Sequence, residues 1–237
     1  MMTIRPILMS TSMVQAVMRQ INLGSGKTQT RRVVTSGTTT WDGGAWPQHL
    51  RDYRFYNGNH SWIDYSLPGS QIIKSDPGGA SHHIRPRIKV GDLLYVRETF
   101  CWGSEGEPGA KDFVIYRANH CDEGAKLLNP WKPSIHMPRS ASRITLRVTD
   151  VWFEAIQDIS ESDILAEGIY DAYRYPMFPP RTWSQKADFY ETPRDAFRAL
   201  WDGINAEKGF GYDKNPYVVV IEFEPVRVNV DDFEVAR

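Results

Sequence analysis

The chain has 237 residues, of which 41% are hydrophobic and 24% charged, a balance typical of a globular protein large enough to bury a core. This composition excludes a disordered chain, a collagen-like chain and a small disulfide scaffold. The net charge is −1, but residues 1–150 carry 19 basic and 12 acidic residues, whereas residues 151–237 carry 9 basic and 17 acidic ones. A basic part of this kind can provide a phosphate-binding face although the whole chain is nearly neutral.

Targeting signals and cysteine usage predict a protein of the cytoplasm. No segment approaches the roughly 18 consecutive apolar residues that a membrane helix needs, and the first twenty residues lack the apolar region of a signal peptide. Cys101 and Cys121 are the two cysteines, and in a reducing compartment we expect both to remain thiols.

The N-terminal part predicts an extended segment, a helix and a strand. After the extended residues 5–8, Met13, Val17 and Ile21 recur at helical spacing, which predicts a short amphipathic helix over residues 12–21 capped by Thr11 or Ser12. The glycines at 24 and 26 are expected to end it. Residues 27–34 then have the β-branched content and alternation of a strand.

Residues 35–86 differ in composition, since eleven of these 52 residues are Gly or Pro and the aromatic residues follow no helical or strand period. We expect a long loop insertion, packed in part by its aromatic side chains. Regular structure resumes afterwards, with strands predicted at residues 90–98, 112–117, 143–153 and 217–223 and with helices opening at Ser160 and Thr192.

These elements predict one domain over residues 1–237. Short strands with helices at the edges, without the spacing of βαβ units, favour a small mixed β-barrel of the α+β class with flanking helices. No internal repeat or interdomain linker is found.

Two motifs do not support the chemistry that they suggest at first. Gly26-Lys27-Thr28 ends like a phosphate loop, but position 21 is Ile where that motif needs glycine, and a strand follows where it needs a helix. The histidines at 82, 83 and 120 and the two cysteines lack the paired spacing of a zinc site. We therefore expect no metal and no cofactor.

Four blocks occur in order along the chain: KTxTxR from Lys27, VGDxLxVR from Val90, DxxAEG from Asp163 and VIEF from Val220. Their order resembles that of the ASCH domain, a PUA-like β-barrel family. A phage and prophage subgroup is more similar still, because it shares RPIL from Arg5, KTQTRR from Lys27, WKPSIHMPR from Trp131 and NPYV from Asn215. The blocks span most of the chain outside residues 35–86.

The resemblance implies a cleft that holds a modified pyrimidine nucleoside or part of an RNA or DNA chain. Some small bacterial ASCH proteins are amidohydrolases that release acetate from N4-acetylcytidine, and their lysine, threonine and glutamate fall on Lys27, Thr30 and Glu167. Amide hydrolysis needs a nucleophile, a proton acceptor and a donor to the oxyanion, which these side chains can provide. Because Lys27 and Thr30 are three apart, they converge only if Lys27 lies in the turn before the strand.

Three alternatives stay open. Lys27 and Glu167 would form a structural ion pair if the trio is not catalytic. The protein would then be a non-catalytic RNA- or DNA-binding module, or a nuclease-like or virion accessory protein of a phage, acting in the host cytoplasm. For nucleotide binding, the resembling blocks contain six cationic or hydrogen-bonding side chains, beside which the rings of Tyr95, Tyr116 and Trp131 could stack on a base. The six are Arg32, Arg97, Arg117, Lys132, His136 and Arg139.

Overall fold

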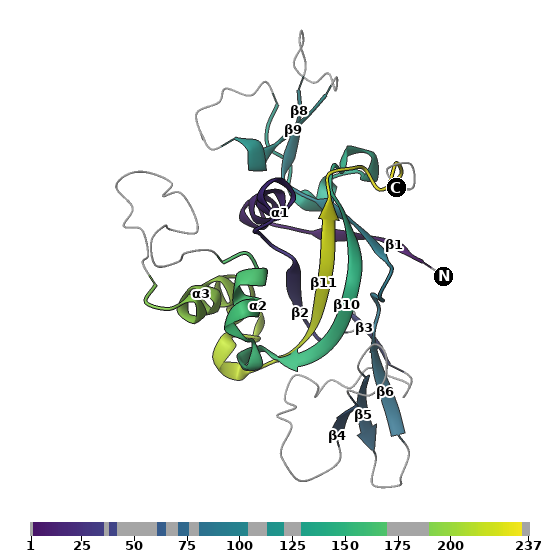
Figure 1. Cartoon of the computed structure of the whole chain (residues 1–237), viewed down its shortest axis with the longest axis vertical. Helices are drawn as coiled ribbons and strands as arrows, with labels where there is room; N and C mark the ends of the chain where they lie inside the picture. Colours follow the sequence, from purple (N-terminus) through teal and green to yellow (C-terminus); the bar gives the residue numbers. More distant parts are fainter. Residues whose placement is uncertain are drawn as a thin grey trace.

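The structure is a computed structural model that describes residues 2–35, 38–41, 61–64, 71–75, 81–103, 113–120, 129–169 and 190–233. Its centre is a five-stranded mixed sheet with the strand order β1-β7-β10-β11-β2 (Figure 1). β1 and β7 run parallel, and each of the other neighbours is antiparallel. The five strands are β1 (Ile4–Leu8), β2 (Gln29–Val33), β7 (Leu93–Arg97), β10 (Thr145–Ala155) and β11 (Tyr217–Val226).

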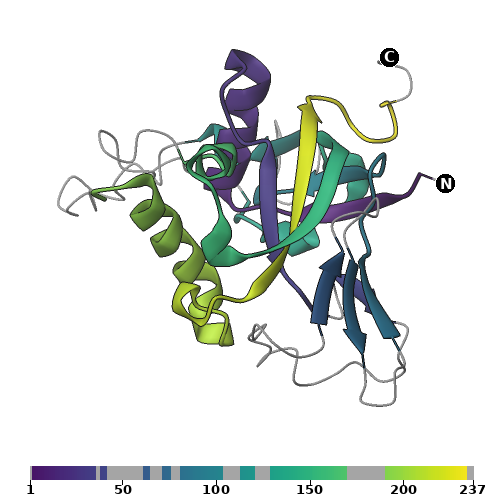
Figure 2. The ribbon, with the colours of Figure 1, turned by 60° about the horizontal axis from the view of Figure 1, so that its bottom comes forward.

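Helices cover both faces of this sheet. α1 (Thr11–Leu23) packs Val14 and Val17 against one face, in a core with Phe153 and Ile221. α2 (Glu161–Ala166) and α3 (Pro193–Asn205) pack against the other face, in a second core with Val218 and Val220. Figure 2 shows α2 and α3 together on one side of the sheet, away from the small sheet formed by β3 to β6. β11 is buried on both faces over residues 218–221, which accounts for its apolar run, whereas β10 alternates between buried and more exposed residues.

The α+β class is confirmed, but the sheet is not a closed barrel. β1 and β2 are its two edges, and within the described residues they form no backbone ladder with each other. A side chain spans the gap instead, because Arg32 Nη2 on β2 donates to the carbonyl oxygen of Leu8 on β1 at 2.8 Å. The prediction of a barrel was therefore wrong for this sheet, although its two edges approach each other.

Part of the insertion forms strands rather than a loop. Its described residues contain a four-stranded antiparallel sheet with the order β3-β6-β5-β4. The prediction of an irregular segment was wrong here because Gly and Pro separate the strands and leave each too short to show a period. The strands are β3 (Thr39–Trp41), β4 (Ser61–Asp64), β5 (Gln71–Ser75) and β6 (Ser81–Pro86).

The remaining described elements are short. β8 (Phe100–Gly103) and β9 (Phe113–Tyr116) form a hairpin-like pair, of which the sequence predicted the second strand. None of the helices in the described ranges is long and apolar enough to cross a membrane. The 3₁₀ turns are η2 (Arg117–Asn119), η3 (Ser134–His136), η4 (Arg139–Ala141), η5 (Ile156–Asp158), η6 (Ala206–Lys208) and η7 (Tyr212–Lys214).

The helix boundaries follow the capping signals closely. Ser160 and Thr192 are the N-caps of α2 and α3, and Thr192 forms a reciprocal capping box with Asp195. α1 begins one residue earlier than its predicted cap allows, because the hydroxyl of Ser10 accepts from the Met13 N–H. Gly24 ends α1 in the left-handed conformation at φ 66°.

Candidate functional site

The site begins where the chain leaves α1 and has not yet entered β2. Lys27 lies in this connection, with its N–H donating to the Ala16 carbonyl of α1 at 3.1 Å, and the next N–H, of Thr28, donates to the Ala166 carbonyl of α2 at 2.8 Å. Gly26 allows the close approach, because a Cβ there would lie 2.2 Å from the backbone nitrogen of Gln20. Lys27 thus lies in the turn before β2, as its convergence with Thr30 requires, and the strand predicted from residue 27 begins two residues later, at Gln29.

A second glycine brings α2 against this connection. Gly168, which follows the C-cap residue Glu167 of α2, has φ +93°, which favours glycine, and a Cβ there would lie 2.8 Å from the Ala16 Cβ and 3.2 Å from the Lys27 Cβ. The chain therefore turns sharply after Glu167 while it packs on Lys27. The close packing holds the Glu167 side chain next to the lysine.

Lys27 and Glu167 form a buried ion pair. The Lys27 side chain is fully buried, and its Nζ donates to Glu167 Oε2 and, at 2.8 Å, to the Glu167 backbone oxygen. Burial lowers the pKa of Lys27, since it removes the ammonium from water, while the Glu167 carboxylate acts in the opposite direction. Arg32 and Arg31 lower that pKa further through charge repulsion.

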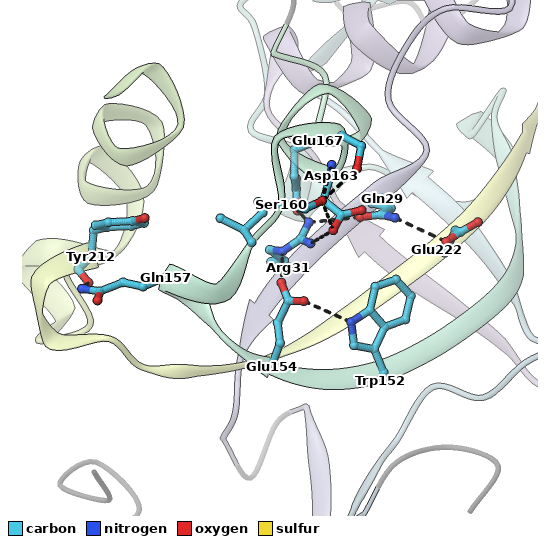
Figure 3. Close-up of polar contacts among 12 residues, drawn as sticks. Gln29, Arg31, Trp152, Glu154, Gln157, Ser160, Asp163, Glu167, Tyr212 and Glu222 are labelled. Carbon is cyan, nitrogen blue, oxygen red and sulfur yellow. Dashed lines mark hydrogen bonds and ion pairs between the residues drawn. The ribbon is translucent and has the colours of Figure 1, made fainter. Parts of the chain in front are cut away.

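The second oxygen of Glu167 is held by Arg31, which joins the ion pair to the sheet. Arg31 Nη1 lies 3.1 Å from Glu167 Oε1, and Arg31 Nε lies 2.5 Å from Glu154 Oε1 on β10. Figure 3 shows the guanidinium between Glu154 on one side and Glu167 with Asp163 on the other. Asp163 Oδ2 is 3.6 Å from Nη2, a buried atom without a hydrogen-bond partner. Trp152 Nε1 donates to the second oxygen of Glu154 at 3.1 Å, so both oxygens of that carboxylate are held.

The register of β2 separates its side chains between the two faces of the sheet. Thr30 and Arg32 lie opposite Ile221 and Val219, which belong to the core on the α1 side. Arg31 lies opposite Val220, which belongs to the core on the α2 and α3 side. Because β2 is an edge strand, groups from both faces meet around it.

A pocket of about 220 Å³ lies along this edge strand, between β2 and α3. Thr30 and Glu167 both line it, as do Arg31 and Arg32. Lys27, which is fully buried, does not line it. The structure thus brings Lys27 and Glu167 into contact and places Thr30 in the same pocket as Glu167. The remaining lining residues are Met13, Val33, Thr35, Thr38, Phe197, Leu200, Trp201, Ile204, Asn205, Lys208 and Phe210.

Of the six residues predicted to bind nucleotides, Arg32 is the one that lines this pocket. Arg97 at the end of β7 donates to the Ile135 carbonyl, and this contact places it beside the turn that carries His136. The backbone of Lys132 forms an isolated β-bridge with Phe100. Arg139 forms an ion pair with Asp231. The guanidinium carbon of Arg117 lies 5.3 Å from the centre of the Trp131 ring.

The three rings predicted to stack on a base each have an arginine over them. Besides Arg117 over Trp131, Arg143 lies 3.9 Å from the Tyr116 ring centre and Arg139 lies 5.9 Å from that of Tyr95. The Tyr116 hydroxyl also donates to the Ala141 carbonyl at 3.0 Å. These contacts make the rings parts of the protein's own packing.

In the ranges that the structure describes, no three His, Cys, Asp or Glu side chains are grouped as metal ligands. Cys101 is buried and free, and burial raises the pKa of its thiol, which disfavours the reactive thiolate. The side chains of His82 and His83 and the whole of Cys121 lie outside the described residues.

Arg31 and Glu154 were missed as site residues by the sequence reasoning. Strand alternation separates Arg31 from Thr30 and Arg32, and this pattern in KTQTRR was available. What the sequence lacked was the pairing of β2 with β11 and of β11 with β10, which brings Glu154 beside Arg31.

Comparisons with protein-family models, curated proteins and solved structures found no match for this chain.

Proposed function

We propose that the pocket beside β2 is the active site of an ASCH-type, PUA-like amidohydrolase that acts on N4-acylated cytidine, as a nucleoside or within a nucleic acid. The observation that carries the proposal is the buried Lys27–Glu167 pair, since Glu167 lines a pocket together with Thr30. The resemblance of KTxTxR and DxxAEG to the ASCH blocks supports the same three residues.

In the proposed reaction, water adds to the acyl carbonyl carbon and the C–N bond to the cytosine amine breaks. Glu167 accepts a proton from the attacking water and returns it to the departing amine. The Thr30 hydroxyl holds that water, and the buried Arg31 Nη2, which has no hydrogen-bond partner, donates to the developing oxyanion. The products are a carboxylic acid and cytidine.

Lys27 is a positioning residue in this scheme. It is fully buried and does not line the pocket, so it acts through the Glu167 carboxylate that it holds. Arg31 fixes the other carboxylate oxygen at 3.1 Å, and the two cations thus determine how the carboxylate is oriented.

The pair Thr30→Val and Thr30→Ser tests the proposal. Valine keeps the shape of threonine and removes its hydroxyl, whereas serine keeps the hydroxyl. We expect Thr30→Val to lower kcat for release of cytidine from N4-acetylcytidine by about 100-fold or more, and Thr30→Ser to retain most of it. Equal activity of the native chain and Thr30→Val would contradict the role of the hydroxyl, while an inert native chain would contradict the proposed function.

A second candidate is a non-catalytic RNA- or DNA-binding module, favoured by one observation. Leu8, whose carbonyl accepts from Arg32, lies opposite Arg97 in the sheet, and Arg97 in turn contacts the turn with His136. The positively charged side chains of Arg32 and Arg97 thus extend from the pocket across the end of β1. For this candidate we expect RNA affinity that falls steeply with salt and that Arg97→Ala reduces, without any hydrolysis of N4-acetylcytidine.

A further inference from the structure

The pocket does not end at Thr30 and Glu167 but continues along β2 toward α3. Its far part is bordered by Leu200 and Ile204 of α3, by Phe210 after η6 and by Val33 of β2. Ile204 is 37% exposed and Leu200 is half-buried, so both present apolar surface to a ligand. The far part is therefore chemically unlike the end that holds Glu167.

Polar groups at the far end are largely engaged within the protein. The Thr38 hydroxyl donates to the Val33 carbonyl at 2.8 Å, and the Asn205 amide donates to the Trp201 carbonyl at 3.2 Å. Trp201 Nε1 donates to the Phe210 carbonyl at 2.7 Å. Lys208, which is exposed, supplies a charge at the rim. A ligand group with several polar atoms would lose hydrogen bonds to water here without regaining them, which is unfavourable.

The volume of the pocket favours a ligand group larger than a methyl group. A methyl group is close in size to a water molecule, whose share of liquid volume is about 30 Å³. The whole pocket, including its end at Thr30 and Glu167, has about 220 Å³, so an acetyl group held at that end leaves space along β2 unfilled. Apolar surface that stays unfilled contributes nothing to binding, whereas each buried methylene contributes.

We propose that the far part of the pocket binds the apolar acyl chain of an N-acylated base, and that acyl groups longer than acetyl are the preferred substrates. This inference rests on the proposed function for the position of the scissile amide, which lies at Thr30 and Glu167. The acyl chain then extends along β2 toward Ile204, and the base and sugar remain at the mouth beside Arg32. Hydrolysis consumes one water and releases the longer carboxylic acid and the free amine.

A series of N4-acetyl-, N4-butanoyl- and N4-hexanoylcytidine tests this assignment. Each methylene buried in the pocket is worth about 0.8 kcal/mol, or about fourfold in kcat/KM. We expect kcat/KM to rise along the series until the pocket is filled. A preference for the acetyl compound would overturn the inference while leaving the proposed function intact.

Ile204→Ala and Ile204→Trp test where the chain binds. Ile204→Ala removes part of the wall and Ile204→Trp fills the space, and both should lower the ratio of hexanoyl to acetyl turnover. Ile4→Ala is the matched control, because Ile4 is also 37% exposed but lies on β1 and does not line the pocket. An unchanged ratio in both Ile204 variants would overturn the placement of the acyl chain.

Equilibrium binding separates this inference from the proposed function. If no compound is hydrolysed but calorimetry shows that N4-hexanoylcytidine binds the native chain more tightly than N4-acetylcytidine, the proposed reaction is wrong and the pocket assignment holds. If no compound is hydrolysed and both bind equally or not at all, both are wrong.

Discussion

Lys27 and Glu167 are held in a part of the protein that excludes water, and this determines how substitutions will act. Lys27 is 0% and Glu167 6% exposed. Removing one partner leaves a buried charge with fewer partners, which costs far more than the pair itself contributes. A variant at either position therefore needs a separate measurement of its folding before a loss of activity is assigned to chemistry.

We predict that Lys27→Met lowers the free energy of unfolding by about 3–5 kcal/mol. Lys27→Met combined with Glu167→Gln should cost less than the two single changes added, because the double variant no longer buries an anion that has lost its lysine. Urea unfolding of the four chains measures this coupling. Strict additivity would mean that the two side chains do not interact.

The stability contributed by Lys27 should depend on pH. Its pKa in the folded chain is lowered by burial, so between that value and the ordinary lysine pKa of about 10.4 the unfolded chain binds more protons than the folded one. The native chain should therefore gain stability relative to Lys27→Met as pH rises through this interval, by up to about 1.4 kcal/mol per pH unit. A difference that stays constant or falls with pH would contradict the lowered pKa.

At the scale of elements, two glycines allow close packing around Lys27: Gly26 against α1, and Gly168 against Ala16 and Lys27. Gly26 and Gly168 permit backbone approaches that a Cβ would block. The Gly26 contact joins residues six to ten apart, whereas the Gly168 contact joins residues more than a hundred apart, which local patterns alone do not reveal.

We predict that Gly168→Ala destabilises the protein more than Gly209→Ala. Both glycines have positive φ, at 93° and 84°, so alanine is strained by about 1–2 kcal/mol at either position. At Gly209 nothing lies within 4 Å of an added Cβ, whereas at Gly168 the Ala16 Cβ lies at 2.8 Å. The difference between the two variants in thermal unfolding therefore measures the contact of α2 with α1 and Lys27. Equal losses would show that the contact is unimportant.

Helices and strands that are determined by residues nearby in sequence were predicted well. The signals Thr192-Pro193 and Asp195 locate the start of α3, and alternation locates β10 apart from two residues at each end. The strands of the insertion were missed because their pairing, such as Ile72 with Ile84, joins short segments across glycine-rich sequence. The site followed the same rule: KTQTRR and DxxAEG suggested Lys27, Thr30 and Glu167, whereas Arg31 and Glu154 required the order β10-β11-β2.

At the scale of the whole molecule, one network of ion pairs joins residues from the basic part of the sequence to residues from the acidic part. Lys27 and Arg31 come from the basic part of the chain, and Glu154, Asp163 and Glu167 come from the acidic part. The near-zero net charge thus includes a buried network that joins β2 to β10 and α2. Under the proposed function, the pocket next to this network holds a single base with its substituent rather than a long phosphate backbone.

The measurement that tests the central claim most directly is release of cytidine from N4-acetyl- and N4-hexanoylcytidine by the native chain and by Glu167→Gln. Glutamine keeps the size of glutamate but cannot accept the proton of the attacking water. We predict turnover by the native chain, faster with the hexanoyl compound, and a loss of about 100-fold or more in Glu167→Gln while its fold is retained by circular dichroism. A native chain that releases no cytidine from either compound, or a Glu167→Gln chain as active as the native one, would contradict the account.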